Sequence, residues 1–221
     1  MPIIRAAIEG LRSRAPNTER LPTAPPQRMS QLSSGIGRGE GSPIQHLAAM
    51  GQTGWLFAVV DRIASSTAAV HWHLYQMAPN GEKRMLDRHP ALDLFNAVNP
   101  FYTRNEFVET TQQHFELAGE MWWVLVRATA SGPPVEMWPI RPDRIQPIPH
   151  RTEYIAGYIY RLGSERIFLE PSDVIFIRRP HPLNPYRGIG PIQSIYSDLE
   201  SERYSATYNA AFFKNSAEPG G

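Results

Sequence analysis

Histidine is the residue type in this sequence most able to do chemistry, and two of the seven histidines stand one residue apart. His71 and His73 fall in the run AVHWHLYQMA, which has the composition of a β-strand. Residues i and i+2 of a strand point to the same face. Two imidazoles on one face could hold a metal ion. Spacing places no third histidine or carboxylate nearby, so the alternative is that the pair simply lines an exposed face.

The other histidines lack a partner for acid–base chemistry. His89 precedes a proline at the start of a predicted helix, and His114 lies inside another predicted helix, so we expect both to be structural. His181 lies between two prolines in a predicted loop. It could mediate a contact there, but no base or nucleophile stands beside it.

Carboxylates and thiols provide no reaction centre either. Asp143 and Asp173 lie in predicted polar turns next to prolines, where carboxylates commonly bind the local backbone. The chain has no cysteine, which excludes disulfides, a thiolate nucleophile and a thiolate zinc site. We therefore predict no catalytic, cofactor-binding or metal-binding residue. A hydrolase or nuclease that uses His71, His73 or His181 remains an alternative hypothesis.

The segment YRGIGPIQS resembles a phosphate cradle at first sight, because glycines at the start of a helix can bind phosphate through free N–H groups. It lacks the lysine of a P-loop and the third glycine of a dinucleotide-binding turn. Pro191 also removes one N–H donor. We therefore expect Gly188 and Gly190 to provide a turn into a helix whose first turn contains Pro191.

Composition limits the class of protein. The chain has 221 residues, of which 42% are hydrophobic and 19% charged, as in one large globular domain or two small ones. Its formal net charge is +1, so no global field favours binding to nucleic acid. No apolar run approaches the ~20 residues of a membrane span, and no signal peptide is evident. We expect an intracellular, soluble protein.

Residues 1–43 differ from the rest. They are dense in Arg, Pro, Ser and Gly and contain almost no aromatic residue, so they cannot bury enough apolar surface to offset the entropy of ordering. We expect a disordered arm, which is either a solvated tail or a segment that touches a partner or nucleic acid.

The predicted elements of the first half are helices around one hairpin. The spacing of Trp55, Val59 and Ile63 predicts a mostly buried helix over TGWLFAVVDRIASSTA. Asn80-Gly81 between two strand-like runs predicts a hairpin whose two central residues both have positive φ. HPALDLFNAV predicts a short helix that Asn99-Pro100 ends.

A second long helix is expected to begin at a capping box, Thr103 to Glu106, and to end at Gly119. Phe107, Thr111, Phe115 and Ala118 are expected to lie on one face of this helix. The apolar run EMWWVLVRATA alternates too little for an exposed edge, so we place it inside a sheet. VEMWPI, YIAGYIYRL, RIFL and DVIFIRR predict further short strands, and the prolines between 139 and 149 exclude a central strand there.

The last predicted element is a helix from Pro191 to about Lys214. A seam with steps of three and four would run along it, formed by Ile192, Ile195, Leu199, Ala206, Ala210 and Phe213. The closing segment NSAEPGG has the composition of a turn, and a turn normally connects an element to a further one. We therefore expect a continuation beyond Gly221. The five tryptophans, nine tyrosines and nine phenylalanines, together with the abundant arginine, are also typical of protein–protein interfaces.

The order of these segments resembles the portal proteins of tailed bacteriophages. The resemblance covers about residues 50–221 and is carried by several weak matches in order, without one invariant motif. The matching segments are VVDRIASSTAAVHWHLY, HPALDLFNAVNPFYTRNEF, LAGEMWWVLVR, VEMWPIRPDRIQP, DVIFIRRP, RGIGPIQSIYSDLE and YNAAFFKNSAEPGG.

The resemblance implies an α+β fold: a wing-type domain of short strands and helices followed by a long helix. It divides the chain into an arm at 1–43, a wing-like domain at 44–189, and a long helix and turn at 190–221 that lead to a missing C-terminal half. Family members are usually about twice this length. No catalytic residue is carried over, because the family is not enzymatic.

The resemblance also implies a place and partners. Such a protein is a subunit of a ring, usually of twelve copies, at one vertex of the phage head in the virion, after assembly in the host cytoplasm. Its implied partners are other copies of itself, the terminase large subunit, the major capsid or scaffolding protein and a head–tail adaptor. Double-stranded DNA passes through the ring without sequence-specific binding, and no membrane is involved. Another head–tail adaptor or a minor capsid protein is the alternative.

Overall fold

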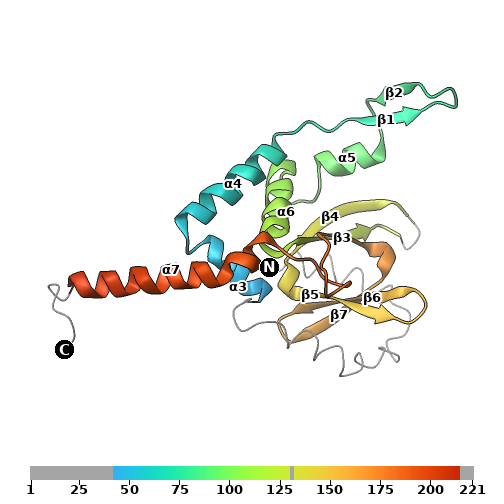
Figure 1. Ribbon diagram of the computed structural model, residues 1–221. Coiled ribbons are helices and arrows are strands. Elements are labelled where there is room, and N and C mark those ends of the chain that lie inside the picture. The colour runs from blue at the N-terminus through green and yellow to red at the C-terminus, as the bar shows by residue number, and fades with distance from the viewer. Residues whose placement is uncertain (1–41, 130–131, 215–221) are drawn as a thin grey trace.

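Two small antiparallel sheets lie face to face, and helices cover the other face of one of them (Figure 1). This computed structural model describes residues 42–129 and 132–214. The expectations for the arm and for the closing NSAEPGG turn, except Ser42 and Pro43, lie outside these residues. The combination of helices with small antiparallel sheets confirms the predicted α+β class.

The central sheet has the order β4-β3-β8 and is buried on both faces. Its strands are β3 (Glu120–Arg127), β4 (Pro134–Ile140) and β8 (Val174–Arg178). In β3, Trp122 and Val124 join the core between the sheets, whereas Trp123 and Leu125 pack with residues of the helical layer. Both faces of β3 are therefore apolar, which confirms its predicted place inside a sheet.

The outer sheet has the order β5-β6-β7. It is formed by β5 (Ile145–His150), β6 (Tyr154–Leu162) and β7 (Glu165–Leu169). The core between the two sheets is rich in aromatic residues: the Trp122 and Phe176 rings stack with centroids 3.6 Å apart. The proline-containing strands β4 and β5 are both edge strands, as predicted.

Helix α6 (Arg104–Ala118) lies between the central sheet and the other helices. Its capping box is present, with the Thr103 and Glu106 side chains each accepting from the other's backbone N–H. Gly119 ends the helix in the left-handed region at φ 74°, as expected for a C-cap glycine. Of the four residues expected on one face, Phe107, Thr111 and Ala118 are buried and Phe115 is half-buried, and His114 and Leu117 are buried as well.

Helix α4 (Gly54–Ala68) is not mostly buried, which contradicts the prediction. Its buried stripe is Leu56, Val60, Ala64 and Ala68, one position after the stripe expected. Trp55, Val59 and Ile63 are between 38% and 52% exposed. Both stripes have helical spacing and both are apolar, so periodicity could not decide which of them packs against α6.

Helix α3 (Pro43–Met50) precedes α4, and its Pro43 occupies the first turn as predicted. Helix α7 (Pro191–Lys214) has the predicted bounds, but its seam is only half used. Ile192, Tyr196 and Leu199 pack in one cluster with Leu56 and Leu117, whereas Ala206, Ala210 and Phe213 are exposed. The outer part of α7 projects from the body (Figure 1).

A two-stranded hairpin projects from another part of the molecule (Figure 1). It consists of β1 (Leu74–Met77) and β2 (Lys83–Leu86), and the short helix α5 (Pro90–Asn96) follows it. The hairpin confirms the prediction, but its turn type does not. Of Asn80 and Gly81, only Gly81 has positive φ, at 85°. The turn spans Ala78 to Gly81, and the Gly81 N–H donates to the Ala78 carbonyl at 2.9 Å. Within the described residues, no helix is long and apolar enough to cross a bilayer.

Candidate functional site

Three glycines meet where α6 ends and α7 begins, and we name Gly119, Gly188 and Gly190 the glycine joint. A Cβ on Gly188 would overlap the Gly119 carbonyl, and one on Gly190 would lie 2.6 Å from the Leu117 carbonyl oxygen. Neither Gly188 nor Gly190 has positive φ. These two glycines are therefore required by close backbone packing, and the expectation that they mainly provide a turn is corrected accordingly.

A buried ion pair spans the glycine joint. Glu120, only 1% exposed, accepts from the Arg187 guanidinium and, at 3.3 Å, from the Gly188 N–H. Arg187 also donates to the carbonyls of Ile145 at 2.9 Å and Pro142 at 3.0 Å. Burial raises the pKa of Glu120 to about 7, against the opposing influence of Arg187 and the Gly188 amide. Both carboxylate oxygens of Glu120 therefore have a hydrogen-bond donor. Through these bonds and those of Arg187, β3 and β5 are connected to the segment that leads into α7.

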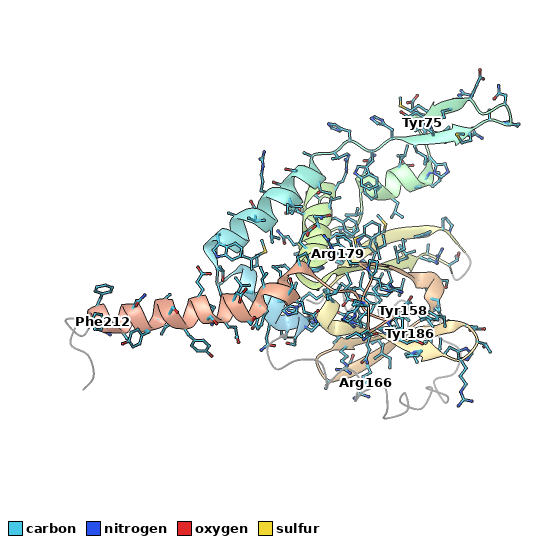
Figure 2. The ribbon with its side chains drawn as sticks, viewed as in Figure 1. Tyr75, Tyr158, Arg166, Arg179, Tyr186 and Phe212 are labelled. Atoms are coloured by element: carbon cyan, nitrogen blue, oxygen red, sulfur yellow. The ribbon has the colours of Figure 1, made fainter. Side chains whose placement is uncertain are left out.

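Arg179, which directly follows β8 and is labelled in Figure 2, connects that strand to the glycine joint. Its backbone N–H donates to the Gly119 carbonyl at 2.8 Å, and its guanidinium donates to Glu116 at 2.8 Å. The guanidinium also lies over the Phe115 ring, 4.8 Å from the centroid. Sequence reasoning missed both arginines and Glu120. The available signal was a carboxylate at the head of the apolar run EMWWVLV, which has to be paired when it is buried.

The candidate histidine pair lies outside the strand on which it was expected. The strand begins only at Leu74, so His71 and His73 lie ahead of it and do not share a strand face as predicted; both are exposed. Within residues 42–129 and 132–214, no group of three or more His, Cys, Asp or Glu residues is arranged to hold a metal.

The remaining candidate histidines are used by the backbone or are buried. His89 caps α5 by accepting from the Ala91 N–H, and His181 accepts from the N–H groups of Leu183 and Asn184, each at 3.1 Å. His114 is buried in α6, and its Nδ1 has no hydrogen-bond partner within the described residues. Burial, aided by the positive charge of Arg141, lowers the pKa of His114 to about 4.

The two candidate aspartates pair with arginines, which their turn positions did not predict. Arg141 donates to both carboxylate oxygens of Asp143 at 2.9 Å. Arg127 donates to Asp173 at 3.0 Å and also to the Ser172 carbonyl. These pairs brace the two short 3₁₀ turns, Pro142–Arg144 and Pro171–Asp173, between strands.

Large apolar side chains are exposed at several places, and three elements each carry a group of them. Helix α4 presents the stripe of Trp55, Val59 and Ile63. The hairpin presents Tyr75, Met77 and Met85, between 48% and 59% exposed. The outer part of α7 presents Tyr204, Tyr208 and Phe213, between 68% and 74% exposed. Exposed apolar side chains that gather on one element, as in these three groups, are candidates for contact with another protein.

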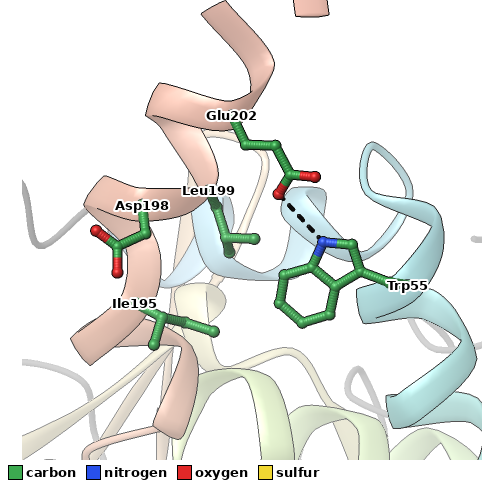
Figure 3. Close-up of a pocket in the computed structure, with 5 residues that line it drawn as sticks. All are labelled: Trp55, Ile195, Asp198, Leu199 and Glu202. Carbon is green, nitrogen blue, oxygen red and sulfur yellow. Dashed lines mark hydrogen bonds between the residues drawn. The ribbon is translucent and has the colours of Figure 1, made fainter. Parts of the chain in front are cut away.

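A groove lies between the start of α4 and the first half of α7 (Figure 3). Trp55, Ile195 and Leu199 provide its apolar lining, and Asp198 and Glu202 provide two carboxylates. The Trp55 indole N–H donates to Glu202 at 3.1 Å. We name these five residues the α4/α7 groove; its volume of about 230 Å³ leaves room for a large side chain.

The family model of the phage portal protein matches residues 55–221. The chain belongs to the phage portal protein family. Among curated proteins no relative matches.

Solved structures agree with this membership. This portal-family chain is similar to one from the neck of an empty gene transfer agent (GTA) particle, computed with C6 symmetry. That match has TM-score 0.71 and 26% identity, and it covers 87% of this chain and 52% of the other. A chain from the neck of a native GTA particle, computed with C12 symmetry, matches with TM-score 0.69 and 24% identity over 87% and 51% of the two chains.

A third match, to a chain of the virion of native GTA, has TM-score 0.63 and 23% identity and covers 97% of this chain and 52% of the other. The chain therefore spans about half the length of the solved structures that it matches. This portal-family chain is thus similar to chains from the neck and from the virion of GTA particles.

Proposed function

We propose that this chain is a structural subunit of a portal ring of about twelve copies at one capsid vertex. The ring would form the conduit for DNA packaging and ejection and would dock the terminase large subunit on one side and a head–tail adaptor on the other. It would also contact the major capsid or scaffolding protein. The observation that carries this proposal is the family match over residues 55–221. The neck structures of C6 and C12 symmetry support the ring.

In this proposal, residues 1–43 are an arm, residues 44–189 are the wing-like domain, and residues 190–221 begin the part that connects to the rest of the ring. The glycine joint lies at the boundary between the last two. Its role is to set the direction in which α7 leaves the wing, because the Glu120–Arg187 pair and the close backbone contacts of Gly188 and Gly190 hold the segment that leads into the helix.

The physical requirements of a ring and a DNA conduit are compatible with this chain, and none of them calls for an active site. A closed ring repeats one head-to-tail contact, so each subunit must present two different surfaces. The exposed apolar surfaces on α4, the hairpin and α7 are available for such contacts. DNA must slide through the conduit, and a net charge of +1 avoids the strong phosphate binding that would oppose sliding.

Native mass spectrometry and electron microscopy of the full-length gene product test this function. We expect closed rings of about twelve subunits. A strictly monomeric full-length product would contradict the proposal. Association with a separate ring, without self-assembly, would instead indicate the alternative of a head–tail adaptor or minor capsid protein.

A further inference from the structure

The hairpin has an apolar face that none of the residues described by the structure covers. In the β1–β2 register, Tyr75 pairs with Met85 and Met77 pairs with Lys83. Directly paired residues of an antiparallel ladder lie on the same face, so these four side chains share one face, which we name the hairpin face. All four are exposed. A two-stranded hairpin is at best marginally stable in water, so it benefits from a surface that packs on it.

The α4/α7 groove is complementary to the hairpin face in chemistry. Its lining is apolar and includes an indole, and its two carboxylates belong to Asp198 and Glu202. The hairpin face offers flexible methionine and tyrosine side chains next to the cation of Lys83. Methionine adapts its shape to irregular hollows and contacts aromatic rings favourably. An apolar contact with an ion pair at its rim would satisfy both surfaces.

The two surfaces are too far apart to meet within one chain. The groove lies at the start of α4, beside Trp55, whereas the hairpin follows the end of that helix. A helix of 15 residues, such as α4, spans about 22 Å. In Figure 1 the hairpin projects at the upper right, whereas α7 begins beside α3 near the middle of the view and runs to the left. Two different surfaces that do not meet within one chain are what a head-to-tail contact between copies requires.

We propose that the hairpin face of one subunit docks in the α4/α7 groove of the next copy of this chain. The inference rests on the proposed ring and names the surfaces by which its subunits meet. Tyr75, Met77 and Met85 cover Trp55, Ile195 and Leu199, while Lys83 lies near Asp198.

Residues 1–221 contain no cysteine, so engineered cysteines here report the contact without background once any cysteine elsewhere in the full-length product has been replaced. Met85→Cys and Asp198→Cys are combined before assembly and treated with a short bismaleimide. We expect a cross-linked dimer from the mixture and little from either variant alone. A chain carrying both substitutions should form a ladder of covalent oligomers. The matched control pairs Asp198→Cys with Arg166→Cys, which lies exposed on the outer sheet (Figure 2).

A charge swap tests the same contact without a covalent cross-linker. Lys83→Glu and Asp198→Lys should each raise several-fold the protein concentration needed for ring formation, and the double variant should recover most of the loss. Rings that form with neither cross-link nor recovery would overturn this docking and leave the ring proposal intact. The groove would then belong to another occupant, such as residues 1–41 or a partner protein. If the unmodified full-length product forms no ring, the proposed function and the docking fail together.

Discussion

Gly119 is held by two separate constraints, a left-handed backbone angle and the carbonyl of Ile189, which a Cβ would overlap. Gly81 has a similar angle, φ 85°, but nothing lies within 4 Å of where its Cβ would be. The two positions therefore separate the cost of the backbone angle from the cost of crowding at the glycine joint.

We predict that Gly81→Ala lowers the free energy of unfolding by about 1 kcal/mol, from the left-handed angle alone. Gly119→Ala should lower it by about 3 kcal/mol or more, because the backbone around Ile189 must also move. Urea unfolding of both variants measures the difference. Equal losses would show that the joint is not closely packed.

The buried histidine of α6 predicts a pH dependence of stability. The pKa of His114 is lowered to about 4 in the folded chain, from an ordinary value of 6.5. Between these values the unfolded chain binds a proton that the folded chain excludes. Stability from this group is therefore fully present above pH 6.5 and declines as the pH falls towards 4, by up to about 1.4 kcal/mol per pH unit.

Replacing His114→Gln should remove the part of the pH dependence that His114 contributes between pH 6.5 and 4.5, so the variant should lose less stability, or gain more, on acidification than wild type does. The raised pKa of Glu120 acts in the opposite sense over this range, but it does so in both chains, so the prediction concerns the difference between them. The measurement is the urea midpoint at several pH values, compared with wild type. His73→Gln is the control, because His73 is exposed and belongs to no packed element. If both variants show the wild-type dependence of the urea midpoint on pH, the burial of His114 does not determine that dependence.

At the scale of elements, α4 divides into a face that holds the fold and a face left for other contacts. Leu56 is buried against Leu117 and Leu199, while Val59 is half exposed. We predict that Leu56→Ala costs about 2–5 kcal/mol of unfolding free energy in the unassembled protein. Val59→Ala should cost less than about 0.5 kcal/mol. Thermal or urea unfolding checks both, and a large loss from Val59→Ala would mean that the exposed stripe supports the isolated fold.

The same elements show how far the sequence predicts this fold. Strand β3, the capping box of α6, the proline-bearing edge strands and the bounds of α7 follow from local patterns, because one residue or one short run decides each. The buried stripe of α4 does not, since two apolar stripes compete and only the position of α6 chooses between them. The role of Gly188 and Gly190 also depends on a distant partner, Gly119, which no local pattern identifies. The site could be predicted only as a glycine-containing helix start.

At the scale of the whole molecule, the protein is a layered body with two projections, the hairpin and the outer part of α7, marked by Tyr75 and Phe212 in Figure 2. All residues of α7 from 201 to 211 are exposed, whereas Ile192, Tyr196 and Leu199 are buried. An isolated helical segment of this length is marginal in water without tertiary support.

We therefore predict that backbone amides of residues 201–214 exchange hydrogen quickly in the unassembled protein. The hydrogen-bonded amides in the inner half of the helix, residues 191–200, should be protected from exchange. Native-state hydrogen exchange resolves the two halves of α7, and the inner half is the control for the outer one. Equal protection along the whole helix in the monomer would contradict the prediction. On assembly, the outer half should gain protection wherever a neighbour covers Tyr204, Tyr208 or Phe213.

The glycine joint also makes α7 a lever. A helix of 24 residues, as α7 is, measures about 36 Å, so a tilt of about 10° at its base displaces its far end by about 6 Å. Angular error at Gly188 and Gly190 is therefore amplified into positional error along the helix. In a ring, the same error would recur in every subunit. The close contacts of the joint thus restrict the angle at which α7 leaves the body. Mutations there should widen the distribution of this angle among the subunits of an assembly before they unfold the subunits.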